Sequence, residues 1–170
     1  YMTPTRIGVG WGDLYISMHK HNWNTSQGHL GGLWEFAYVG IGYANKCLDV
    51  LPETGNDQAQ MRFVRALNYY LLFDAFRNVP LETTQDVEEG HLPEQANAQE
   101  IYDFCVSELN AIKNDLGTNK THGYPNRYAA CMVLAKLYLN YNAYFRTSGN
   151  EYYEKALTEV NEVINDGGYS

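Results

Sequence analysis

The sequence predicts an all-α fold in which antiparallel helix pairs follow a loop-rich N-terminal segment. From residue 31 onward, apolar side chains recur at steps of three and four, the period of a helix with one buried face. Glycine, proline and short polar runs separate these stretches, and no alternating apolar and polar run is long enough to predict a strand. A length of 170 residues fits one domain, so residues 1–170 are expected to form a single helical domain.

The segment of residues 1–30 is expected to be irregular. It contains Pro4, four of the chain's fifteen glycines and a polar run of histidine, asparagine, threonine and serine. Neither the helical nor the strand period persists there. Residues 1–30 are therefore the predicted loop-rich part of the domain, and residues 31–170 are its helical scaffold.

The first two helices are predicted between Gly31 and Pro80. The first ends at Pro52 and Gly55 and has one apolar stripe, made of Trp34, Ala37, Ile41, Ala44, Leu48 and Leu51. The second begins near Asp57 and is apolar nearly all round, which predicts a central position. Its apolar residues are Met61, Phe63, Val64, Leu67, Tyr70, Leu71, Phe73 and Ala75.

Three more helices follow a polar link rich in glutamate, threonine and glutamine. The third has Gly117 as its expected C-terminal stop, and Asn126 is the expected N-cap of the fourth. The last two are joined by a short polar turn at residues 147–150, and the fifth ends at Gly167 and Gly168. This pair resembles one tetratricopeptide-type unit, and links of this length favour antiparallel pairs stacked into an array.

Composition limits the class of ligand. Twelve basic against twenty acidic residues give a net charge of −8. Neither nucleic acid nor an anionic membrane surface is an expected partner, because both bind clustered lysine and arginine. No apolar run reaches 18 residues, so no membrane span is expected. Aromatic residues make up 14% of the chain. Such an excess is typical of a recognition surface, although most of the tyrosines are expected to fill gaps between helices.

The three cysteines, Cys47, Cys105 and Cys131, each lie inside an apolar helical pattern. The sequence has no CxxC pair and no cysteine–histidine spacing typical of a metal site. We therefore predict that all three are small buried core residues.

Five segments in order resemble the RagB/SusD family, glycan-binding lipoproteins of the outer membrane in Bacteroidetes-type bacteria. The most specific is Met61–Phe73, with an Arg-x-x-Arg-Ala core, followed by Val79-Pro80-Leu81. The other segments are Trp34 to Asn45, Tyr128 to Leu139, Ala156 to Tyr169, and the opening Thr3 to Arg6 with Trp11 and His21 to Trp23. The resemblance covers essentially the whole chain, with a departure at Arg77, where the family often has glycine.

The resemblance implies a scaffold of tetratricopeptide-type helix pairs with no catalysis and no cofactor. It implies an outer-membrane, cell-surface lipoprotein that captures an oligosaccharide or polysaccharide and docks onto a SusC-like TonB-dependent transporter, which imports the glycan. The family's lipid-bearing N-terminus and large C-terminal part have no counterpart in the sequence. The chain is therefore expected to be a fragment of a larger SusD-like protein, attached to the membrane only through a lipid anchor outside it.

The glycan site is expected within residues 1–30. A sugar ring offers C–H bonds that a flat aromatic can cover, and hydroxyls that set specificity, since an unpaired one costs about 1–3 kcal/mol. In the family an arginine and a later tryptophan contribute to binding, and Arg6 and Trp23 match their spacing. We expect Trp23 to stack on a ring and four polar residues to bond the hydroxyls. These four are Arg6, Asp13, His21 and Asn24.

Two alternatives stay open. In the first, Trp11 and Trp23 pin the N-terminal loop to the helices, which for Trp11 is the preferred interpretation. In the second, the chain is a tetratricopeptide-type scaffold whose groove binds a protein or peptide, and the early aromatic residues are merely structural.

Catalysis and metal binding are not expected. A glycosidase needs two carboxylates roughly 5–10 Å apart, and no motif pairs the two acids of the first 48 residues, Asp13 and Glu35. His19 and His21 form a His-x-His pattern, which alone is a weak metal signal. We interpret these histidines as hydrogen-bonding loop residues.

Arg62 and Arg65 are expected to be structural rather than ligand-binding. They fall on one side of the second predicted helix, together with Tyr69. A guanidinium is always charged, so inside an aromatic surround it needs carboxylate or carbonyl partners.

Overall fold

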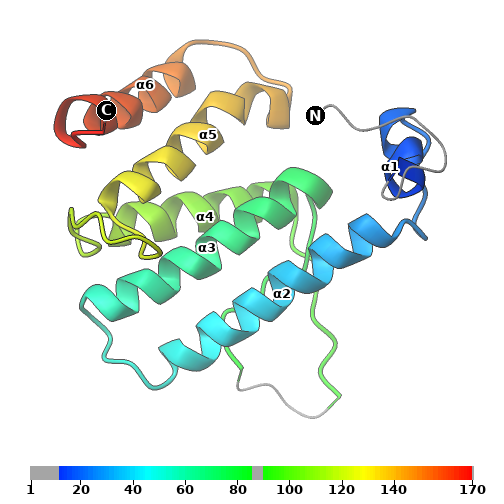
Figure 1. Cartoon of the computed structure of the whole chain (residues 1–170), viewed down its shortest axis with the longest axis horizontal. Coiled ribbons are helices and arrows are strands. Elements are labelled where there is room, and N and C mark those ends of the chain that lie inside the picture. The colour runs from blue at the N-terminus through cyan, green and yellow to red at the C-terminus, as the bar shows by residue number, and fades with distance from the viewer. Residues whose placement is uncertain (1–11, 86–89, 170) are drawn as a thin grey trace. The chain divides into compact units, whose positions relative to one another are not determined.

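The computed structural model describes residues 12–85 and 90–169, with side chains from residue 16 onward. This part of the chain contains six α-helices and no β-strand, which confirms the all-α prediction (Figure 1). The helices are α1 (Gly12–His19), α2 (Gly28–Leu48), α3 (Asn56–Phe76), α4 (Ala98–Ile112), α5 (Arg127–Phe145) and α6 (Glu151–Asp166). None of these described helices combines the length and the apolar character that a membrane span requires.

The chain divides into two compact units at a point inside α2. The first unit ends at Tyr38 and includes α1 and the first part of α2. The second starts at Val39 and includes the rest of α2 and the helices from α3 to α6. The exposed tryptophans Trp23 and Trp34 belong to the first unit, whereas the apolar core described next belongs to the second.

The first unit differs from the sequence prediction, because it contains an additional helix. α1 lies within the segment predicted to be irregular, and α2 begins at Gly28, three residues before the predicted start at Gly31. A helix of eight residues makes about two turns, which is too short for an apolar period to be recognised. Glycine has a low helix propensity and the apolar stripe begins only at Trp34, so the sequence gives little sign that α2 already starts at Gly28.

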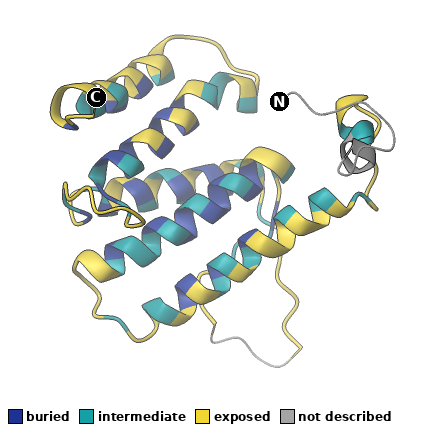
Figure 2. Ribbon diagram, viewed as in Figure 1, coloured by how far each residue is buried: buried dark blue, intermediate teal, exposed yellow. Residues whose placement is uncertain are grey.

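The core of the second unit lies between α3, α4 and α5. α3 packs against α4 and α5, and α5 also packs against α4 and α6. Figure 2 shows the buried residues gathered along these three helices. Nine residues of α3 are buried, which confirms its predicted central position. The largest fully buried side chains include Tyr69, Leu72, Phe73, Ile101, Leu109, Leu134 and Leu137.

Local polar bonds define several helix ends. Asn97 and Glu100 form a reciprocal capping box at the start of α4. The predicted N-cap of α5 is confirmed, because the Asn126 side-chain oxygen accepts the Ala129 amide at 3.0 Å. The predicted stop at Gly117 is shifted, since α4 ends five residues earlier. Gly117 lies in the following loop with φ 65°.

Arg77 follows α3 with a φ of 70°, in the left-handed region that glycine adopts most easily. Its guanidinium lies 5.3 Å from the ring centroid of Phe73 and 4.8 Å from that of Tyr144. It also donates a hydrogen bond to the Tyr144 carbonyl. These contacts offset the backbone strain. They give a physical reason for an arginine where the resembling family often has glycine.

Cys105 and Cys131 are buried as predicted, whereas Cys47 is half-buried. Burial raises the pKa of the Cys105 thiol, and burial together with Glu159 and Glu162 raises the pKa of Cys131 to about 12. Since the thiolate is the reactive form, we expect iodoacetamide at about pH 8 to label Cys47 first in the folded chain. Mass spectrometry of tryptic peptides measures the order of labelling. Rapid labelling of Cys105 or Cys131 before denaturation would contradict their burial.

Candidate ligand-binding surface

The loop between α1 and α2 contains three of the five residues predicted to bind ligand, namely His21, Trp23 and Asn24. Two backbone hydrogen bonds fold this loop back onto the end of α1. The His21 amide donates to the Met18 carbonyl at 3.1 Å, and the Asn22 amide donates to the Ser17 carbonyl at 2.8 Å. His21 itself is left-handed, with φ 54°, and turns the chain at this point.

Asn24 leads the chain into α2. Its side-chain oxygen accepts the Ser26 amide at 2.9 Å, and its carbonyl accepts the Gln27 amide at 3.1 Å. A side-chain oxygen bound to the amide two residues on is an Asx turn, which fixes the local backbone. Both ends of the loop that contains Trp23 are therefore held by hydrogen bonds.

Trp23 lies at the surface of this loop, with 49% of the residue exposed to solvent. The ring centroid of His21 is 5.5 Å from that of Trp23, and the two ring planes are tilted by 51°. A buried indole would have favoured the interpretation in which Trp23 pins the loop to the helices. The exposure of Trp23 instead leaves its indole accessible to a ligand.

The other two predicted residues have no described side chain. Arg6 lies outside the described residues, as does Trp11. Asp13 lies in α1, but its side chain is also outside the described part. The structure thus brings His21, Trp23 and Asn24 together, and the roles of Arg6 and Asp13 stay predictions.

A second exposed indole in the first unit differs from the sequence prediction. The apolar period predicts Trp34 on the buried stripe of α2, but 37% of the residue is exposed. Its ring lies 4.9 Å from that of Tyr38, one turn further along the helix. The spacing of four residues between two aromatic side chains is the signal that predicts such a ring pair on a helix surface.

The described side chains of the first unit offer little formal charge to a ligand. Among residues 16–38, Lys20 and Glu35 are the charged side chains besides the histidines, and their charges are opposite. A strongly anionic polymer would find no basic patch among these residues. An uncharged ligand is compatible with them.

One group of possible metal ligands is present among the described residues, and it lies in the second unit rather than among the histidines of the first. It consists of Cys131, Glu159 and Glu162. Lys113 donates to Glu159 at 3.0 Å, and Arg127 pairs with Glu162. These cations balance both carboxylates, so the group serves as an ion-pair network that joins the end of α4 to α5 and α6.

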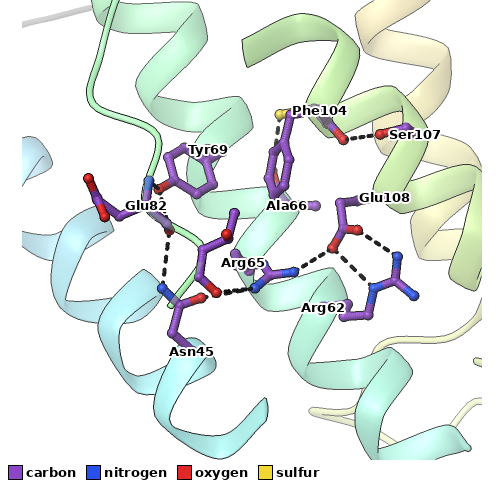
Figure 3. A network of polar contacts seen from close by, with 11 residues as sticks. Asn45, Arg62, Arg65, Ala66, Tyr69, Glu82, Phe104, Ser107 and Glu108 are labelled. Atoms are coloured by element: carbon purple, nitrogen blue, oxygen red, sulfur yellow. Dashed lines mark hydrogen bonds and ion pairs between the residues drawn. The ribbon is translucent and has the colours of Figure 1, made fainter. Parts of the chain in front are cut away.

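The arginines of α3 lie in a buried polar network of the second unit (Figure 3). Glu108 of α4 accepts from both, at 2.5 Å from Arg62 and 2.9 Å from Arg65. Arg65 also donates to the side chain of Asn45 and to the Thr83 carbonyl, both at 3.0 Å. These carboxylate and carbonyl partners confirm the predicted structural role. They join α2, α3, α4 and the segment after α3.

The same network fixes the segment that follows α3. The Tyr69 hydroxyl donates to the Glu82 carbonyl at 2.8 Å and accepts from the Glu82 amide at 2.7 Å. Asn45 donates to the same carbonyl at 3.1 Å. Burial raises the pKa of Tyr69 to about 12, so its hydroxyl remains a donor across the neutral range. The Asn45 amide, the Tyr69 hydroxyl and the Glu108 carboxylate thus bind groups within the chain.

Comparison with protein families matches residues 6–139 to a SusD-like family described as "Starch-binding associating with outer membrane". The starch-binding protein SusD of Bacteroides thetaiotaomicron is 30% identical over 141 residues, which cover 76% of this chain and 24% of that protein. The chain therefore spans about a quarter of the length of this curated relative.

Solved structures share the fold. A SusD superfamily protein from Parabacteroides distasonis has a TM-score of 0.80 and 26% identity, covering 92% of this chain and 36% of that one. Surface glycan-binding protein A from Bacteroides uniformis has a TM-score of 0.71 and 25% identity, covering 93% of this chain and 36% of that one. The helices described above thus correspond to about a third of each of these two proteins.

Proposed function

The chain belongs to the SusD family, and from that premise we propose that it is part of a non-catalytic protein that binds oligosaccharide or polysaccharide at the cell surface. The family match extends over residues 6–139. Two of the similar proteins are named for binding starch and surface glycans. Within this chain, the main support for the proposal is the exposed indole of Trp23.

An exposed indole supplies one half of sugar recognition. Its flat face covers the C–H face of a sugar ring, so that water leaves both apolar surfaces. His21, whose ring lies beside Trp23, and Asn24 supply polar groups for the hydroxyls. Because the Ser26 amide already binds the Asn24 side-chain oxygen, we assign the Asn24 Nδ2 group to the ligand.

The loop geometry supports this assignment. Hydrogen bonds at both ends of the loop order Trp23 before a ligand arrives, which reduces the conformational entropy lost on binding. The opposite charges of Lys20 and Glu35 suit a neutral glycan. Arg6 and Asp13 are proposed to complete the set of groups that bond the hydroxyls.

Delivery of the glycan to a SusC-like TonB-dependent transporter is also part of the proposal, as is attachment to the outer membrane through a lipid. The support is the description of the matching family as associated with the outer membrane. In the SusD protein of Bacteroides thetaiotaomicron, 76% of the length lies beyond the matched 24%. We assign the anchor and further ligand contacts to the corresponding parts of a full-length protein.

Replacing Trp23 by alanine is expected to weaken glycan binding at least about tenfold, which corresponds to about 1.4 kcal/mol. The substitution removes the ring that would cover the sugar face and leaves the loop's backbone hydrogen bonds in place. Trp23→Phe should retain part of the affinity, because it keeps a flat aromatic face. Calorimetric titration with a panel of neutral oligosaccharides that includes maltoheptaose measures the difference.

Tyr43→Ala is the matched control, since Tyr43 is 69% exposed but lies in the second unit. It should leave affinity unchanged. An unchanged affinity of Trp23→Ala would place the site elsewhere. If no glycan of the panel binds the wild-type chain or a full-length protein, the tetratricopeptide-type scaffold that binds a protein or peptide becomes the better proposal.

A further inference from the structure

A hollow of about 400 Å³ lies in the second unit, between the start of α3 and the loop that joins α4 to α5. Figure 1 shows this loop on the same side of the unit as the first turn of α3. Its volume falls within the range of small-ligand sites. The polar and aromatic side chains that line the hollow are Asn56, Asp57 and Gln60 from α3, and Asn119, Thr121 and Tyr124 from the loop.

Hydrogen bonds hold the two walls of the hollow together. The side-chain amide of Asn56 donates to the carbonyls of Asp115 and Leu116, at 3.0 Å each. At the base of the loop, the Arg127 amide donates to the Gly117 carbonyl at 2.8 Å. The start of α3 and the loop are therefore joined directly, and the hollow exists without a ligand.

The loop is also ordered internally. The Asn119 side-chain oxygen accepts the Thr121 amide at 3.2 Å and the Thr121 hydroxyl at 2.9 Å. The Tyr124 amide donates to the Thr121 carbonyl at 3.2 Å, and Gly123 turns the chain with φ 85°. A wall fixed in this way loses little conformational entropy when it binds a ligand.

The groups in the hollow suit a neutral sugar. Tyr124 is 62% exposed, so its ring can cover a face of C–H bonds. The carboxylate of Asp57 can accept from ligand hydroxyls. Gln60 donates its amide to the Asn56 side chain, and its carbonyl oxygen can accept from a ligand hydroxyl.

The charge of the hollow decides between classes of ligand. The start of a helix attracts anions, but Asp57 places a carboxylate in the first turn of α3. The described residues that line the hollow include this acid and no lysine or arginine. A phosphate or an acidic sugar would therefore be repelled, whereas a neutral polyol would not.

We propose that this hollow is a second carbohydrate-binding site, for neutral oligosaccharides, in which Tyr124 stacks on a sugar ring while Asp57, Gln60 and Thr121 bond its hydroxyls. It shares with the proposed function the premise that the chain binds glycan, but it uses none of the residues of the loop around Trp23. Two sites on one chain raise the avidity for a polysaccharide that can reach both.

The test is a two-dimensional ¹⁵N–¹H NMR titration of the whole 170-residue chain. The titrants are maltoheptaose and a xyloglucan heptasaccharide, taken to about 10 mM because open sites of this kind bind in the micromolar to millimolar range. Amide signals of Asp57, Gln60 and residues 119–124 should shift. Tyr124→Ala should weaken the affinity reported by these signals at least about tenfold, and Tyr124→Trp should preserve it.

Two further variants separate this site from the proposed one. Trp23→Ala should abolish the shifts within residues 16–38. The glycan affinity measured from the signals around Tyr124 should stay the same. Tyr153→Ala is the matched control, because Tyr153 is a 45% exposed tyrosine of α6, and it should leave both sets unchanged. In the wild type, an oligomer of galacturonate should shift the amide signals around Tyr124 less than maltoheptaose does, because it is acidic. Asp57→Asn should reduce this difference between the two ligands.

Three results would overturn the inference. The first is a set of shifts confined to residues 16–38, which leaves the proposed function intact. The second is loss of both sets in Trp23→Ala, which shows that the hollow responds only indirectly. The third is the absence of any shift with either sugar, which removes the inference and the proposed function of the isolated chain together. Shifts around Tyr124 alone would support the hollow and move the site away from Trp23.

Discussion

Glu108→Gln is expected to lower the free energy of unfolding by about 3–5 kcal/mol. The Glu108 side chain is 13% exposed and lies between Arg62 and Arg65, whose side chains are 23% and 10% exposed. Glutamine keeps the shape of glutamate but removes the charge that both guanidinium groups share, and it leaves them largely buried and unbalanced. Urea denaturation followed by circular dichroism measures the loss.

Glu151→Gln serves as the control for this change. Glu151 pairs with Lys155 at 2.7 Å, four residues further along α6, and its side chain is 72% exposed. Such surface pairs contribute about 0.3–0.5 kcal/mol, so the control should be nearly neutral. If Glu108→Gln were equally mild, the network would contribute no more than a surface pair, and the structural role assigned to Arg62 and Arg65 would be wrong.

The same carboxylate makes part of the wild-type stability sensitive to acid. Burial raises the pKa of Glu108, but the hydrogen bonds and charges of Arg62 and Arg65 outweigh it, so the pKa lies below the ordinary value of 4.5. A group whose pKa is lowered on folding stabilises the fold above its unfolded pKa, and this contribution is lost as the pH falls through the folded pKa. Wild-type stability should therefore decline below about pH 4.5, and Glu108→Gln should lack that part of the decline.

The helices of the second unit could be predicted because apolar residues that repeat with the helical period over many positions indicate a helix with one buried face. The period shows which side chains share a face, but not whether another element covers that face. Trp34 and Ile41 belong to the same predicted stripe of α2, yet Trp34 is 37% exposed in the first unit and Ile41 is 2% exposed in the second. The sequence does not predict α1, because its two turns are too few to establish an apolar period.

The two candidate sites differed in how far the sequence could predict them. The loop around Trp23 is local, so the density of aromatic and polar residues within one short segment marks it. The hollow beside Tyr124 depends on the contact between Asn56 and Asp115, which are 59 residues apart. No local pattern distinguishes Tyr124 from the other fourteen of the chain's fifteen tyrosines. Sites formed by distant segments become visible only once the packing of the helices is known.

Phe73→Ala is expected to destabilise the chain by about 3–5 kcal/mol, through lost burial and the cavity that alanine leaves. Phe73 is fully buried where α3 meets α4 and α5. Its ring makes edge contacts with Tyr102 at 6.0 Å and Tyr144 at 4.6 Å. Urea denaturation compares this variant with Phe36→Ala, which removes a 67% exposed ring and should change stability by less than about 0.5 kcal/mol. A loss below about 2 kcal/mol for Phe73→Ala would show that the site collapses around the smaller side chain.

Phe73 also supports the left-handed backbone of Arg77, because the guanidinium lies 5.3 Å from the centre of its ring. In the wild type, Arg77→Gly removes backbone strain but also loses the contact with the ring. Phe73→Leu keeps apolar volume but has no aromatic face. In this background, Arg77→Gly still removes the backbone strain, but it no longer loses the contact between the guanidinium and the ring of Phe73. Arg77→Gly should therefore be more favourable in the Phe73→Leu background than in the wild type, by about 0.5–1 kcal/mol. Equal effects in the two backgrounds would mean that the ring of Phe73 does not hold Arg77 in place.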